Sequence, residues 1–204
     1  MSSSVCRARV SFLVSLLLVF GLMANAWGQS PAPRAKAEVR AVRFNLVNAP
    51  ESTIRWFEAD VELEVRSPGG RTTFVDRVKI TLGLGIRSLD GTYRFYQSEV
   101  ESISLEVGSA HFRFYLPPEI VRRNGLRPEV EFWLAEISAA GEAQPNSPRS
   151  HSPSLREAER LANFQGKVAA EAPARDGELL PQHLTPFAAQ YRGATPSMLR
   201  KSRQ

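Results

Sequence analysis

The residues of this sequence best suited to chemistry are carboxylates at alternate positions in one short run. They are Glu58, Asp60, Glu62 and Glu64. Two carboxylates held close together can share acid–base work in a hydrolase. The residues between them are small or apolar, and this period of two is typical of a half-buried β-strand. On such a strand the carboxylates would line the wet face, so we expect solvated charges and not a catalytic pair.

Other chemically active groups give no signal for a site. The histidines are His111 on an expected strand and His151 and His183 near the C-terminus, without metal-ligand or nucleophile–base spacing. Gly83 and Gly85 lack the third glycine and the following helix of a dinucleotide-binding loop, so we expect them to weaken a strand ladder. We predict no catalytic residue, no cofactor and no metal. A hydrolase built on the carboxylates is the least favoured hypothesis.

The N-terminus has the organisation of a secretory signal peptide. Arg7 and Arg9 precede an apolar stretch at 10–23, and small residues at 24–26 form a cleavage site. The stretch is too short to span a bilayer comfortably, although an uncleaved anchor is the alternative. We predict export to the periplasm or the outer cell surface. The single cysteine, Cys6, precedes that site, so the mature chain would hold no disulfide.

The positive charge lies outside the expected globular part. The chain has a net charge of +5 and a pI near 9.8. Residues 27–140 carry equal numbers of basic and acidic side chains, so the excess lies in the leader and in residues 141–204. A nucleic-acid-binding protein concentrates its cations on one folded face. The sequence therefore predicts no nucleic-acid partner.

Composition divides the chain into regions. We predict a signal peptide at 1–26, a flexible segment at 27–37, a β-sandwich domain at 38–140 and a Pro-rich tail at 141–204. Prolines interrupt every apolar cluster after residue 165, so we expect this tail to be mostly disordered. One short helix at 154–164 is the exception, with Ser154 as its cap.

The pattern within 38–140 is all-β. Period-two segments separated by turn residues predict about seven strands, near 42–46 and at 54–66, 72–82, 93–97, 103–107, 110–116 and 130–138. Residues 117–125 begin with two prolines and end with Asn-Gly, which predicts one helical turn. Many short strands with almost no helix favour a single antiparallel sandwich.

Aromatic residues out of phase with the expected core are candidates for a contact surface. They are Trp56, Tyr93, Tyr96 and Trp133. Tyr96 must point away from Tyr93 and Phe95 on a strand. Such rings on the wet side of a sheet often mark an interface. The alternative is that they close the core at the ends of the sheets.

Several strand segments together resemble a known family. They are 56–65, 74–80, 93–96, 100–105 and 112–121. In order, behind a signal peptide, they are similar to small exported immunoglobulin-like proteins of a bacterial pilus-like system, which are encoded beside type IV pilus alignment proteins. The resemblance covers about residues 38–140. It implies a non-enzymatic immunoglobulin-like sandwich outside the cytoplasm, and it supplies no functional residue.

The leading hypothesis is a structural or adaptor module that contacts other envelope or pilus-type proteins. Exposed strand edges would provide the backbone groups for such contacts. The second hypothesis is a carbohydrate- or surface-ligand-binding sandwich, in which Trp56, Trp133 or Tyr96 stacks on sugar rings. A flat, exposed row of aromatic rings would favour this second hypothesis, whereas buried rings would remove it.

Overall fold

The computed structural model describes residues 36–67, 74–191 and 196. The predicted leader and most of the flexible segment at 27–37 lie outside the described residues. The strands are β1 (Lys36–Asn48), β2 (Arg55–Arg66), β3 (Phe74–Arg87), β4 (Tyr93–Glu106), β5 (Gly108–Leu116), β6 (Phe132–Ala139), β7 (Glu142–Ala143) and β8 (Leu180–Pro181). The helices are α2 (Pro118–Asn124) and α3 (Ala158–Glu171), with the 3₁₀ turns η3 (Pro153–Leu155), η4 (Ala172–Arg175), η5 (Gln182–Leu184) and η6 (Pro186–Ala189). Within this part of the chain, no helix is long and apolar enough to cross a membrane.

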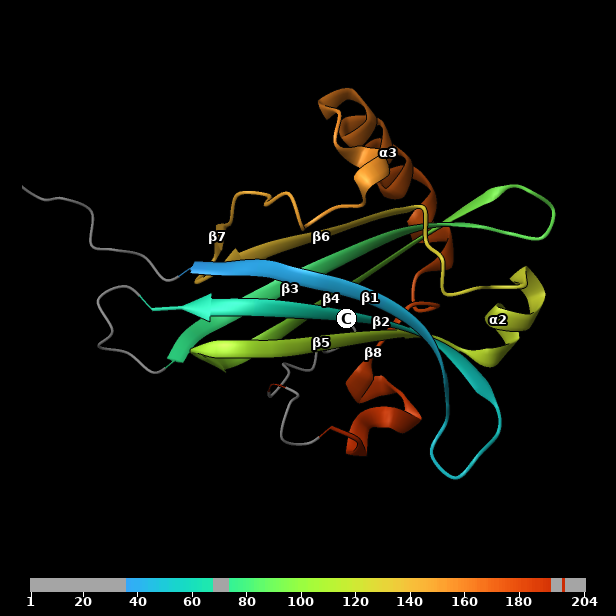
Figure 1. Cartoon of the computed structure of the whole chain (residues 1–204), viewed down its shortest axis with the longest axis horizontal. Coiled ribbons are helices and arrows are strands. Elements are labelled where there is room, and N and C mark those ends of the chain that lie inside the picture. Colours follow the sequence, from blue (N-terminus) through green and yellow to red (C-terminus); the bar gives the residue numbers. More distant parts are fainter. Residues whose placement is uncertain (1–35, 68–73, 192–195, 197–204) are drawn as a thin grey trace, which may run out of the picture. The chain divides into compact units, whose positions relative to one another are not determined.

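The strands form two antiparallel sheets, which confirms the predicted all-β sandwich (Figure 1). Sheet A has the order β1-β2-β5-β8, and sheet B has the order β4-β3-β6-β7. Constant-type immunoglobulin sandwiches place the first, second, fourth and fifth strands in one sheet and the third, sixth and seventh in the other. Here β1, β2 and β5 share sheet A and β3, β6 and β7 share sheet B, as in that arrangement, but β4 lies in sheet B beside β3.

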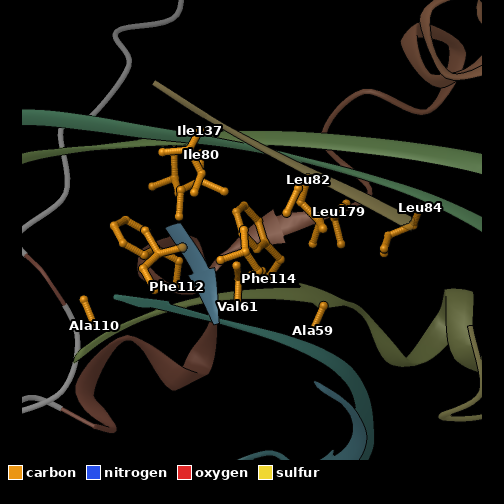
Figure 2. Packing of buried hydrophobic residues seen from close by; sticks show 14 of the residues in the cluster. Ala59, Val61, Ile80, Leu82, Leu84, Ala110, Phe112, Phe114, Ile137 and Leu179 are labelled. Carbon is orange, nitrogen blue, oxygen red and sulfur yellow. The ribbon is translucent and has the colours of Figure 1, made fainter. Parts of the chain in front are cut away.

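The main core lies between the inner faces of the two sheets. Val61 and Phe112 of sheet A point toward Ile80 of sheet B, and all three are fully buried (Figure 2). Leu179, from the segment before β8, packs into the same cluster. Each such side chain contributes roughly 1.5–3 kcal/mol on burial. The core therefore draws on both sheets and on one residue of the C-terminal region.

The short helix α2 was predicted correctly. Pro117 occupies its N-cap and Pro118 its first position, where a missing N–H costs nothing. Gly125 ends it with φ of 58°, the left-handed conformation that glycine adopts without strain. The helix connects β5 in sheet A to β6 in sheet B.

Two predictions about strands were wrong. The segments expected as separate strands at 93–97 and 103–107 are one continuous strand, β4. Gly83 and Gly85 do not weaken β3, because both residues pair with β4 on one side and with β6 on the other. The ladder runs on to Arg87, five residues beyond the predicted end of this strand.

The prediction of a mostly disordered tail was wrong for residues 142–191, here called the C-terminal segment. It contains β7, β8, α3 and the 3₁₀ turns, and it buries Leu155, Phe164, Val168, Ala172, Leu179 and Phe187. Its prolines do not break these elements. Pro153 and Pro186 occupy the first position of a 3₁₀ turn and Pro173 the second, where no N–H is required. The helix expected at 154–164 is instead η3 followed by the longer α3.

The C-terminal segment also explains why two strands face the opposite way from expectation. Phe95 of β4 and Leu134 of β6 lie on the outer face of sheet B, where they pack with Phe164 and Val168 of α3. Figure 1 shows α3 beside sheet B. Tyr96 and Trp133, expected on the wet side, pack instead with the main core. Where α3 packs, sheet B is apolar on both faces, so alternation alone could not identify the inner face there.

The two glycines of β3 form the floor on which α3 packs. A Cβ at Gly85 would lie 3.1 Å from the ring of Phe164 and 3.1 Å from the ring of Phe95. A Cβ at Gly83 would lie 3.5 Å from Val168. The missing side chains let the helix approach the sheet closely. This packing requirement accounts for glycine in the middle of a strand.

We predict that Gly85→Ala lowers the free energy of unfolding by about 1–3 kcal/mol, because the added methyl group overpacks the contact between α3 and the sheet. Urea denaturation measures the change. Gly166→Ala, in the middle of α3 with open space around it, is the matched control and should stabilise by about 0.5–1 kcal/mol. Equal effects of the two substitutions would contradict this account of Gly85.

Candidate functional site

The strongest concentration of polar chemistry is a carboxylate row on the outer face of β2, formed by Glu58, Asp60 and Glu62. These side chains were expected to be solvated, and that expectation was wrong, because the three residues are only 5%, 9% and 8% exposed. The row lies between β1 and β5, whose outer faces supply donors. Buried carboxylates need such partners, since an unpaired buried charge costs several kcal/mol.

Donors from both neighbouring strands bind the first two carboxylates. The hydroxyl of Tyr115 donates to Oε2 of Glu58 at 2.8 Å, and Nδ2 of Asn45 lies 3.4 Å from Oε1. Nδ1 of His111 lies 3.0 Å from Oδ1 of Asp60.

Arginines complete the row. Arg43 on β1 donates to Oε2 of Glu62 at 2.7 Å, and Nε of Arg40 lies 3.4 Å from Oε1. Nε of Arg113, on β5, lies 3.6 Å from Oδ1 of Asp60. Arg40 sits at an irregularity in the pairing of β1, between Val39 and Ala41, which brings a second cation toward the row.

The carboxyl of Glu62 is held in its charged form. Burial by itself raises its pKa, but the hydrogen bond from Arg43 and the charges of Arg43, Arg40 and His111 lower the pKa more. The net pKa therefore lies below the ordinary value for glutamate. The arginines thus stabilise the folded protein at neutral pH through this carboxylate.

The C-terminal segment covers one end of the row. Phe187 of η6 stacks on Tyr115 with ring centroids 4.3 Å apart and planes 5° apart, and it meets Trp56 edge-on at 5.7 Å. The guanidinium of Arg113 lies 4.1 Å from the ring centroid of Tyr191. Burial raises the pKa of Tyr115, and the negative charge of Glu58 raises it further. The Tyr115 hydroxyl therefore stays a donor at every physiological pH.

The carboxylates of the row have partners within the protein. Each of the three is bonded to a donor from its own chain, and each of these residues is buried. Within the described residues, no three His, Cys, Asp or Glu side chains lie close enough to hold a metal ion. The carboxylates and their donors therefore satisfy one another on the outer face of sheet A.

Tyr96 lies in the core and not on a contact surface, contrary to the prediction, and Trp133 packs against the core. Tyr96 is fully buried, and its hydroxyl accepts a hydrogen bond from Nδ2 of Asn124 at 2.8 Å. Trp133 is half-buried against the main core, where its ring meets Phe44 edge-on at 6.1 Å. Both residues follow the alternative, in which aromatic rings close the core.

Trp56 and Tyr93 are half-buried and lie in different sheets. Trp56 packs against Phe187 on the outer face of sheet A. Tyr93 packs against Phe132, with ring centroids 5.2 Å apart, and its hydroxyl donates to Glu131. The four predicted rings therefore do not form one flat row, and their contact with a partner stays a prediction.

Sequence reasoning missed the residues that engage the carboxylate row. They are Arg40, Arg43, Asn45, Arg113 and Tyr115. A signal was present, since the alternate residues of β5 are His111, Arg113 and Tyr115, and these pair in register with the carboxylates of β2. Only the strand order, which the sequence does not reveal, places them opposite each other.

Comparison with known proteins identifies the fold and no family. No family model matches the chain, and no curated protein does so at a significant level. A crystal structure of a protein from Akkermansia muciniphila is similar, with a TM-score of 0.64 and 16% sequence identity. The match covers 85% of this chain and 100% of that one, which is more than residues 1–140 of the 204 could supply. The shared fold therefore includes part of the region after residue 140.

We predict that Tyr115→Phe lowers the free energy of unfolding by about 1.5–3 kcal/mol, because the buried carboxylate of Glu58 loses its closest donor. Urea denaturation of the two single variants and of Tyr115→Phe with Glu58→Gln measures the coupling. The double variant should lose clearly less than the sum of the single ones. Additive losses would show that the hydrogen bond between Tyr115 and Glu58 contributes nothing to the free energy of unfolding.

We predict that protonation of Glu62 at low pH lowers the free energy of unfolding. Its folded pKa lies below the unfolded value, so its contribution is complete above pH about 4.3 and falls away as the pH drops through the folded pKa. Thermal melts of Glu62→Gln should therefore depend less steeply on pH below that point than wild-type melts. Glu129→Gln, in an exposed loop, is the control. Wild-type steepness in Glu62→Gln would refute the assignment.

Proposed function

We propose that this protein is a non-enzymatic structural or adaptor module of the bacterial envelope, which is exported and works in a pilus-like assembly. The observation that carries the proposal is the self-sufficiency of the carboxylate row, the richest polar cluster of the fold. Its carboxylates are bonded to Tyr115, His111 and Arg43 of the same chain. A catalytic pair needs at least one acid or base that faces a substrate.

The class of fold supports the proposal. Immunoglobulin-like sandwiches recur among cell-surface and envelope proteins that act through contact. Fold alone does not determine function, so the envelope location and the pilus-like assembly rest on the leader and on the family resemblance of the strand segments. The sugar-binding alternative has lost one of its three candidate rings, because Tyr96 is fully buried, whereas Trp133 is half-buried against the core.

Crosslinking in the native envelope, followed by mass spectrometry, tests the proposal. The expected result is a chain that begins at Trp27, recovered in the envelope fraction and crosslinked to proteins of a pilus-type machinery. An intact residue 1 in the cytosolic fraction, or a crosslink pattern without envelope proteins, would overturn it. So would hydrolysis of a glycan or peptide panel that Asp60→Asn abolishes while the fold is kept.

A further inference from the structure

The outer edge of β1 differs from the other long edges of the sandwich. The C-terminal segment covers the outer edge of β6 through backbone hydrogen bonds from Gln144 to Ile137, from Ala135 to Ser150 and from Ser152 to Trp133. β8 covers part of the edge of β5, and η4 lies against β4. In the part of the chain that the structure describes, β1 pairs with β2 alone.

The two halves of β1 are unlike. The first half ends at the irregularity around Arg40, a feature that discourages the pairing of an edge strand with another chain. The second half, residues 41–48, pairs regularly with β2. Its inner row, Val42, Phe44 and Leu46, packs against the core but is only half-buried. Edge strands of this kind leave backbone donors and acceptors and apolar surface for one more strand.

We propose that residues 41–48 of β1 accept an extended segment of a partner protein by strand addition, and that apolar residues alternate with carboxylates in this segment. The inference rests on the proposed adaptor function and names its docking site. The apolar residues of the added segment complete the inner row beside Val42, Phe44 and Leu46. Its carboxylates lie on the outer face, near Arg43.

Charge selects this partner. Arg40 and Arg43 remain 55% and 54% exposed although they bind the carboxylate row, so they can take a second set of carboxylates from the open side. β2 already shows the strand type that suits β1, since its alternate residues are carboxylates that face Arg43. A second copy of this chain fits less well, because pairing β1 with β1 sets arginine-bearing outer faces side by side.

Hydrogen exchange with a defined peptide tests the proposal. The probe is a synthetic peptide with the sequence of residues 57–65, in which four carboxylates alternate with other residues. The control peptide carries lysine at the four carboxylate positions. Bound to residues 27–204 of the chain, the acidic peptide should slow amide exchange at 41–48 by about fivefold or more, and the control should not. Unchanged exchange at 41–48, equal effects of both peptides, or protection centred on 108–113 of β5 would overturn the proposal.

A variant that adds a negative charge on the same face as Arg43 sharpens the test. Val47→Glu places a carboxylate on the outer face of β1, opposite Trp56, and should abolish protection by the acidic peptide while allowing protection by the lysine peptide. Ile103→Glu makes the same change at an exposed position of sheet B and should leave the wild-type result intact. Equal losses of protection at 41–48 in both variants would show that the peptide does not bind at this edge. Failure here together with envelope crosslinks would place the partner elsewhere and leave the adaptor function standing.

Discussion

The fold depends on apolar contact between the C-terminal segment and both sheets. Phe164 packs on the glycine floor of sheet B, Leu179 enters the main core and Phe187 stacks on Tyr115 of sheet A. Each of these residues covers surface that the strands alone would leave in water. A sandwich of about a hundred residues has a modest core, so these added contacts are a substantial part of its stability.

The same cover determines the chemistry of sheet A. Once Phe187 and Tyr191 lie over its outer face, the carboxylate row beneath and beside them is largely removed from water. Arginine, histidine and tyrosine side chains from the neighbouring strands supply the hydrogen bonds that these buried carboxylates need. The carboxylates that suggested catalysis in the sequence are therefore part of the packing of sheet A. The contact surface that we propose lies at the strand edges, above all along β1.

The sequence predicted well wherever one face of an element is dry and the other is wet. The helix α2, the strand β5 and the inner face of β2 follow their patterns, because proline, Asn-Gly and strict alternation act locally. The predicted inner faces of β4 and β6 were wrong, because apolar residues that pack against α3 also lie on their outer faces. The tail looked disordered because its prolines are frequent, although they occupy turn positions where proline fits. The prediction that the carboxylates are exposed was wrong for a related reason. Alternation shows which face of the strand a residue is on, but it does not show what covers that face.

Urea unfolding of a chain that ends at residue 152, compared with the full chain, tests most directly whether the C-terminal segment completes the fold. The account predicts that the shortened chain loses cooperative unfolding, or unfolds at a far lower midpoint, because Phe95, Leu134 and Tyr115 become exposed. An unfolding midpoint and a denaturant dependence equal to those of the full chain would contradict it. They would show that the two sheets need no cover.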